Sequence, residues 1–187
     1  MKLTSTPLAG LVVVEPRLFT DDRGYFFESF QDRRYAEVGI TDTFVQDNYS
    51  RSTRGVLRGM HFQRQSPQAK LVTVIRGRVF DVGVDLRLGS PTFGRWFGAE
   101  LSDSGPRQMY LPEGFAHGFC VLSEWADVHY KVNRRYDAAD EGGVLWSDEG
   151  IGIEWPIRDV TVTPRDAAFP PLAGLTASHL PLIAPRS

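Results

Sequence analysis

The segment from Lys70 to Asp85 constrains the fold most strongly, because it contains two β-strand patterns on either side of one glycine. Leu71–Ile75 is a run of apolar and β-branched residues, which favour strands. The pattern stops at Gly77 and resumes from Arg78 onward. A glycine between two strand patterns is typical of a tight turn. The sequence therefore predicts a β-hairpin that turns near Gly77.

The second arm of this hairpin has two different faces, because side chains alternate along a strand. Asp81 and Asp85 share one face. The other face is apolar and carries Phe80, Val82, Val84 and Leu86. We expect one of the two faces to be solvated or functional.

The rest of the chain also has the composition of a β-protein. Its 18 glycines and 12 prolines separate short segments that are rich in Val, Phe, Tyr and Thr. This spacing predicts a sandwich or a jelly roll. Beyond the hairpin, strands are expected at Leu11–Glu15, Tyr25–Ser29, Phe44–Ser50, Gly94–Leu101, Gln108–Leu111, His117–Leu122 and Asp127–Val132.

Two segments depart from this pattern. Gln31–Gly39 predicts one short helix that has Tyr35 and Val38 on its buried side and ends at its glycine. After Trp155-Pro156 the chain is rich in proline, and we expect an irregular arm that lies over the domain or over a partner.

The size and charge of the chain exclude several classes of protein. Its 187 residues suffice for one domain, which we take to span 1–187. With 42% hydrophobic and 24% charged residues, it has the balance of a soluble globular protein. A net charge of -2 provides no general attraction for nucleic acid or for an anionic membrane, so an anion would need a local cluster of arginines.

Cysteine content and the first apolar run bear on location. Cys120 is the only cysteine, so no disulfide can form within the chain, and the cytoplasm is the expected compartment. Leu8–Val14 is too short to span a bilayer and is not followed by a cleavage pattern of small residues. We therefore expect neither a signal peptide nor a membrane anchor.

Two histidines lie beside glycines, which let a ligand or a backbone approach closely. His61 lies in Arg58–Gln63, and His117 lies in Pro112–Phe119. The second segment has the Pro-x-Gly-x-x-His pattern of cupin jelly rolls, so the chain resembles the cupin superfamily. A metal-binding cupin would have His-x-His followed by a glutamate, whereas Phe62-Gln63 follow His61 here. We therefore expect no metal site.

The other histidines and the nearby cations have ordinary explanations. His179 and His129 are expected to be structural, and His129 faces away from Tyr130 on the same strand. Arg58 and Lys70 flank apolar strand segments near His61. Such cations either hold a diphosphate or form a solvated rim, and the residues alone leave both alternatives open.

Five segments together carry a closer resemblance, and they occur in the same order as in the dTDP-4-dehydrorhamnose 3,5-epimerase family. They are Asp22–Phe30, Phe44–Asn48, Gly55–Phe62, Ser90–Gly94 and Pro112–Phe119. The resemblance covers most of the chain as far as Trp155-Pro156. It implies a mostly β, cupin-type jelly roll, the double-stranded β-helix, with one or two short helices.

The resemblance also implies a reaction. The family's substrate is dTDP-4-dehydro-6-deoxy-D-glucose, in which carbons 3 and 5 flank the ketone at carbon 4. Their inversion, a step in dTDP-L-rhamnose biosynthesis, needs a base on one face of the sugar and a proton donor on the other, with an enolate between the two steps. His61 matches the base and Asp166 its carboxylate partner. Tyr130 matches the proton donor, and Lys70 matches the residue that stabilises the enolate oxygen.

Further positions match the family's substrate-binding residues. Around the diphosphate and the sugar these are Arg23, Arg58 and His117, whereas Glu28, Gln46 and Asn48 match the positions that recognise thymidine and ribose. Asp81, Glu141 and Arg165 also fall at pocket positions, and Arg165 replaces the family's usual lysine. The resemblance implies no cofactor, and it implies a homodimer in which an arm of one subunit completes the other's site.

Three alternatives remain at this stage. Relatives that invert only one carbon, or that act on another deoxysugar, would share the same residues, and only pocket shape and proton-delivery geometry separate them. A metal-dependent cupin would use His61 and His117 as ligands. A module that only binds sugar nucleotides would have no need for the catalytic set His61, Lys70, Tyr130 and Asp166.

Overall fold

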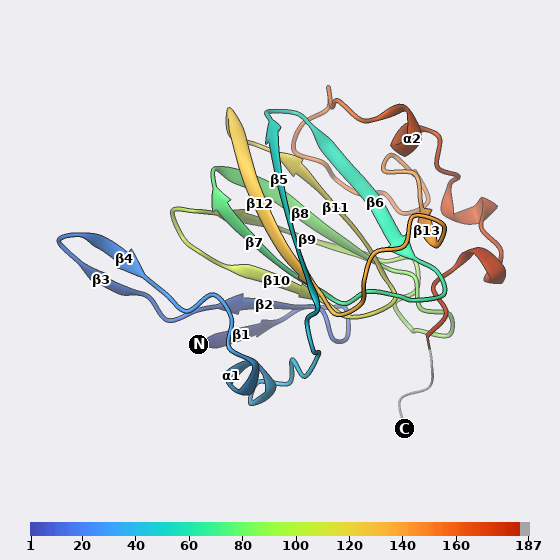
Figure 1. Cartoon of the computed structure of the whole chain (residues 1–187). Helices are drawn as coiled ribbons and strands as arrows, with labels where there is room; N and C mark the ends of the chain where they lie inside the picture. Colours follow the sequence, from blue (N-terminus) through green and yellow to red (C-terminus); the bar gives the residue numbers. More distant parts are fainter. Residues whose placement is uncertain (184–187) are drawn as a thin grey trace.

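The computed structural model describes residues 1–183, and two antiparallel sheets that face each other make up most of it (Figure 1). In the six-stranded sheet the order is β1 (Lys2–Ser5), β2 (Val12–Glu15), β10 (Gln108–Leu111), β7 (Lys70–Arg76), β12 (Trp125–Val132) and β5 (Gln46–Thr53). In the five-stranded sheet it is β13 (Glu141–Gly143), β6 (Leu57–Gln63), β11 (Phe115–Val121), β8 (Arg78–Asp85) and β9 (Trp96–Ser102). The predicted mostly β jelly roll is confirmed.

The predicted hairpin is right in its turn and wrong in its pairing. Gly77 separates β7 from β8 and has a φ of 80°. However, β7 pairs with β10 and β12, whereas β8 pairs with β11 and β9, so the chain crosses from one sheet to the other at Gly77. Both arms carry a continuous apolar face, and such a pattern does not distinguish a hairpin from a crossing between two packed sheets.

The alternation on β8 separates an interior face from an outer face, and neither meets bulk water. Asp81 and Asp85 have no exposed surface. Asp85 accepts hydrogen bonds from Arg87, Ser90 and Thr92, and it thereby organises the loop after β8. The opposite, apolar face packs beneath the C-terminal segment, so burial rather than solvation explains it.

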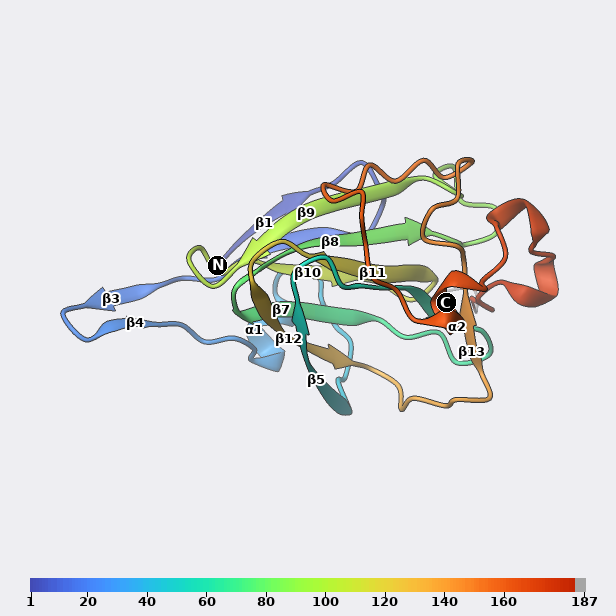
Figure 2. The ribbon, with the colours of Figure 1, turned by 90° about the horizontal axis from the view of Figure 1, so that it is seen from above.

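The C-terminal segment is the predicted irregular arm, and it covers the outer face of the five-stranded sheet. Trp155, Leu172 and Leu175 pack against the cluster formed by Val82, Val84 and their neighbours. The segment contains one helical turn, α2 (Pro164–Ala167), and two 3-10 turns at Leu172–Gly174 and Ala177–His179. In Figure 2 it runs in orange and red beside β8 and β11, around the β13 end of the sheet.

The N-terminal third contributes the predicted helix and a projecting hairpin. The helix α1 (Asp32–Ala36) is shorter than expected, and Tyr35 on its inner side is only 1% exposed. The strands β3 (Phe19–Asp21) and β4 (Gly24–Phe26) form a separate two-stranded arm that extends away from the body (Figures 1 and 2). Along residues 1–183 the helices are all too short or too polar to cross a membrane.

Candidate active site

A cavity of about 240 Å³ lies between the sheets and collects six of the predicted site residues. Gln46 and Asn48 come from β5, Lys70 from β7 and Tyr130 from β12, which are neighbouring strands of the six-stranded sheet. His61 on β6 and Glu141 on β13 come from the facing sheet. The cavity therefore has two chemically different walls.

His61 is held by Asp166 across 105 positions of the chain. The distance from His61 Nε2 to Asp166 Oδ1 is 3.0 Å, and the other carboxylate oxygen accepts a hydrogen bond of 3.2 Å from the Gly59 N–H. Asp166 lies in α2, which begins because the Thr163 side chain caps the backbone N–H of Asp166. The short C-terminal helix thus delivers its carboxylate to the imidazole.

The charge state of Asp166 determines which nitrogen of His61 can accept a proton. Burial acts to raise the pKa of Asp166, but the hydrogen bonds from His61, Gly59 and Thr163 and the charge of His61 outweigh it and lower the pKa to about 2. The ionised carboxylate only accepts hydrogen bonds, so Nε2 carries the proton and Nδ1 keeps its lone pair. His61 can therefore act as a base through Nδ1.

Lys70 supplies a buried cation to the opposite wall. It is 7% exposed, and burial lowers its pKa to about 8 against the opposing charges of Asp81 and Glu141. The ammonium form still predominates at neutral pH. A desolvated ammonium at the cavity wall suits an oxygen that becomes negatively charged during a reaction.

Tyr130 is the candidate acid. Burial raises the pKa of its phenol, Arg58 opposes this effect and Glu141 adds to it, so the proton stays on the oxygen at neutral pH. Its neighbour His129 points to the outer face, as predicted, where Nε2 is 3.7 Å from Asp47. Since Tyr130 and His61 belong to facing sheets, a flat ligand between the sheets can present one side to each residue.

His117 and Asp81 form a second histidine and carboxylate pair, deeper than the first. Their Nε2 to Oδ1 distance is 2.8 Å, and the two residues are 5% and 0% exposed. Burial lowers the pKa of His117, and the negative charge of Asp81 opposes that effect. The His117 ring centre is 6.1 Å from that of Tyr130, and its Cα pairs with that of His61. The pair therefore lies behind the cavity, between the base and the acid.

The other predicted binding residues stand in different relations to this cavity: Gln46 lines it, Arg165 contacts residues that line or support it, and Arg58 lies outside it. Gln46 donates to Asn48 Oδ1 over 2.8 Å. Arg165 pairs with Glu141 and also approaches Asp166, with 3.4 Å between Nε and Oδ1. Arg58 donates to Ser52 Oγ over 2.9 Å and lines a neighbouring cavity beside Trp125 instead.

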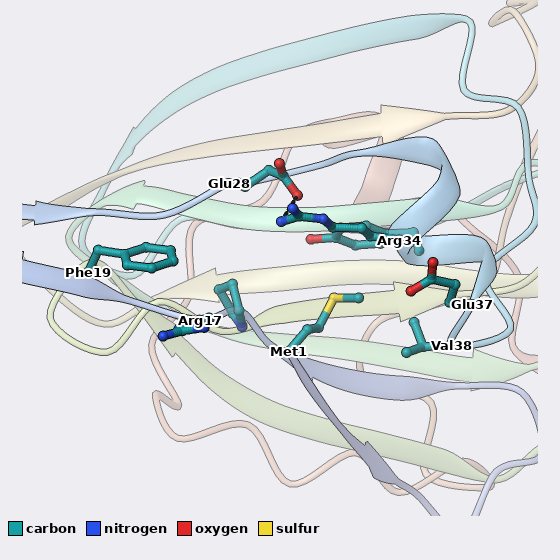
Figure 3. Close-up of a pocket in the computed structure, with 9 residues that line it drawn as sticks. Met1, Arg17, Phe19, Glu28, Arg34, Glu37 and Val38 are labelled. Carbon is teal, nitrogen blue, oxygen red and sulfur yellow. Dashed lines mark hydrogen bonds and ion pairs between the residues drawn. The ribbon is translucent and has the colours of Figure 1, made fainter.

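Arg23 and Glu28 do not join the site within one chain. Arg23 lies at the turn of the projecting arm, with 90% of its side chain exposed, and pairs with Asp21. Glu28 borders a different cavity at the base of the arm, where Arg34 Nη1 is 3.1 Å away (Figure 3). Neither residue lines the cavity of His61.

Four further residues line the cavity without having been predicted, namely Phe62, Gln63, Gln68 and Tyr136. Tyr136 is 49% exposed, and its hydroxyl donates to Glu141 Oε2 over 3.1 Å. An aromatic side chain in the charged loop after β12 was the one available signal for it. Across residues 1–183, no group of three His, Cys, Asp or Glu side chains is placed to hold a metal ion.

The comparisons with known proteins agree with this arrangement. Residues 5–174 match the family model of dTDP-4-dehydrorhamnose 3,5-epimerase. The enzyme of that name from Methanothermobacter thermautotrophicus is 48% identical over 174 residues, which are 91% of this chain and 94% of that protein. A dTDP-4-dehydrorhamnose 3-epimerase from Streptomyces niveus is 44% identical over 168 residues, covering 89% of this chain and 81% of its own length.

A solved structure extends the similarity to the whole fold. The dTDP-6-deoxy-D-glucose-3,5-epimerase of Legionella pneumophila, in complex with dTDP-4-keto-L-rhamnose, superposes with a TM-score of 0.94. It is 48% identical, and the match covers 98% of this chain and 99% of that one. The chain therefore belongs to the dTDP-4-dehydrorhamnose 3,5-epimerase family.

Proposed function

We propose that this protein inverts carbons 3 and 5 of dTDP-4-dehydro-6-deoxy-D-glucose and gives dTDP-4-dehydro-L-rhamnose. The observation that carries the proposal is the placement of a carboxylate-bound histidine and a protonated tyrosine on facing walls of one cavity. Inversion requires the proton to leave from one face and to arrive at the other, and this geometry provides both groups.

Each inversion is one proton removal and one proton return. His61 Nδ1 takes the proton from the carbon beside the ketone, and the electron pair of the broken C–H bond moves to the ketone oxygen. Lys70 donates to this enolate oxygen, which lowers the barrier by stabilising charge that is absent in the ground state. Tyr130 then gives its proton to the opposite face of the carbon, which restores the ketone.

The two residues exchange their protons with water before the next step. After one inversion His61 holds an additional proton and Tyr130 is a phenolate. Asp166 stabilises the imidazolium, and Lys70 and Arg58 are the cations near the phenolate. His61 has 23% of its side chain exposed, so solvent can carry its proton away.

The arm supports a homodimer in which each subunit completes the other's substrate site. Phe19, Tyr25 and Phe26 on the arm are between 49% and 67% exposed, an arrangement that favours burial against another surface. The outer face of the six-stranded sheet also exposes Tyr49 and Ile75. A second copy would let Arg23 and Glu28 take part in nucleotide binding, since within one chain neither lines the cavity of His61.

Inversion of one carbon only is the second candidate, favoured by the 44% identity to the Streptomyces niveus 3-epimerase. The experiment that separates the two is NMR of the proposed substrate in D2O without added metal. Deuterium at both carbons, lost in His61→Ala, supports the 3,5-epimerase. Deuterium at one carbon supports the mono-epimerase, and deuterium at neither contradicts both.

A further inference from the structure

Phe169 contacts the imidazole of His61 and has no place in the reaction as described so far. The ring centres of the two side chains are 5.8 Å apart, and their planes meet at 75°, which is an edge-to-face contact. Phe169 is partly buried and follows Asp166 by three positions. One short segment therefore touches His61 twice, through a carboxylate and through an aromatic ring.

Gly143 explains why the ring fits beside His61. Gly143 lies on the edge strand β13, directly opposite His61 in the ladder. A Cβ atom added to Gly143 would lie 2.3 Å from Phe169 Cε2 and 2.4 Å from two further ring atoms. The Phe169 ring thus fills the space that a side chain at position 143 would occupy, which is a known way to stabilise a strand glycine.

The backbone that carries Phe169 is tied to the chain just after β13. The Leu145 N–H donates to the carbonyl oxygen of Pro170 over 2.9 Å. Two residues further on, the Leu172 N–H donates to Asp148 Oδ2 over 2.5 Å. The two prolines after Phe169 also restrict the backbone. The ring is therefore presented from a fixed backbone rather than from a free loop.

We propose that Phe169 is a positioning residue that sets the plane of the His61 imidazole. The hydrogen bond to Asp166 fixes one atom of the imidazole, Nε2, and leaves the ring free to swing about that contact. The contact with the Phe169 ring removes this freedom and keeps Nδ1 directed into the cavity. This inference rests on the proposed function, because it concerns the same proton transfer, and it predicts an effect on kcat rather than on binding.

Four variants test this role by NMR rates of deuterium uptake from D2O. Phe169→Ala is expected to lower kcat about tenfold and to change KM by less than about twofold. Gly143→Ala, whose methyl group displaces the ring, should lower kcat to a similar extent. In the double variant the methyl group enters vacant space, so the loss should not exceed that of either single variant. Phe169→Leu keeps an apolar side chain over Gly143 and should recover part of kcat.

Leu172→Ala is the matched control, because Leu172 belongs to the same segment but packs on the outer cluster of the sheet. It should lower the unfolding temperature and leave kcat unchanged. If Phe169→Ala keeps the wild-type kcat, or if Leu172→Ala loses as much kcat, the positioning role is wrong and the proposed function stands. A folded wild-type protein that takes up no deuterium would overturn both. If Phe169→Ala does not fold, Phe169→Leu and Gly143→Ala are compared with the wild type instead. A wild-type kcat in both of these variants would equally contradict the role.

Discussion

The Lys70 ammonium lies 6.0 Å from the centre of the Tyr130 ring, and both residues line the same wall of the cavity. Their strands, β7 and β12, are neighbours in the six-stranded sheet. A cation near a phenol stabilises the phenolate that forms when the phenol gives up its proton. Lys70 can therefore serve two oxygens in turn, the enolate of the sugar and the phenolate of Tyr130.

The buried position of Lys70 predicts an alkaline limit to catalysis. With a pKa of about 8, the ammonium is charged below this pH and neutral above it. We expect kcat to fall as the pH rises through about 8, because the neutral amine stabilises an enolate poorly. The kcat profile of Lys70→Arg, whose guanidinium stays charged, should lack this fall. An identical fall in wild type and Lys70→Arg would contradict the assignment.

The same group predicts a pH dependence of stability. In the unfolded chain Lys70 has its usual pKa of 10.5, so between pH 8 and 10.5 the unfolded state binds more protons than the folded state. The free energy of unfolding should therefore rise with pH in this window, by roughly 3 kcal/mol at most. Urea titrations of wild type and Lys70→Met at several pH values measure the difference. A parallel pH dependence in the two proteins would contradict the prediction.

Sequence reasoning located the strands well and the sheets poorly. The bounds of β10 were predicted as observed, and the turn at Gly77 lies where the pattern stopped. The pattern did not reveal β6, because Gly59 interrupts it, although this strand carries His61. It also could not assign β7 and β8 to different sheets, because strand pairing depends on residues far away in the chain.

The site was predictable only through the family resemblance. Asp166 meets His61 across 105 positions, and no local spacing indicates such a contact. Phe169 gave no signal at all, because a phenylalanine before two prolines is ordinary in an irregular arm. Arg23 was assigned to the substrate, but in one chain it stays in the arm. The sequence indicates which residue types could take part, whereas the distances between these residues depend on tertiary packing.

Because the chain crosses between the sheets at Gly77, replacing this glycine should cost more stability than its positive φ alone would cause. Gly77 and Gly89 both have a φ of 80°, but a Cβ at Gly77 would lie 2.2 Å from the Trp125 carbonyl oxygen, and none of the described atoms lies within 4 Å of a Cβ at Gly89. We expect Gly89→Ala to cost about 1 kcal/mol and Gly77→Ala to cost clearly more. Chemical denaturation of both variants gives the comparison. Equal costs would show that the close approach at Gly77 is absent.

The proposed exchange of arms predicts complementation between two inactive variants. Arg23→Ala alters the arm that a subunit contributes to its partner's site, and His61→Ala alters the subunit's own site. A mixed dimer then has one site with both lesions and one intact site. Coexpressed in equal amounts, the pair should recover about a quarter of the wild-type sites, since half of the dimers are mixed. Activity no higher than that of the separate variants would contradict the arm exchange.

The ion pair of His61 and Asp166 predicts a loss in kcat when the charge is removed. Asp166→Asn keeps the size of the side chain but no longer stabilises the imidazolium, and its amide can favour the wrong tautomer. We expect kcat to fall by about 10²- to 10⁴-fold, with a much smaller change in KM. Steady-state kinetics of the variant give this result directly. A variant with a raised KM and an unchanged kcat would instead place Asp166 in substrate binding.

If His61 and Tyr130 act on opposite faces of the sugar, the two groups can be separated by following Tyr130→Phe in D2O. Without the phenol, His61 can still remove a proton and return a deuteron to the same face. We expect Tyr130→Phe to incorporate deuterium without inverting the carbon, and His61→Ala to do neither. Inversion at the wild-type rate by Tyr130→Phe, or deuterium uptake by His61→Ala, would contradict it.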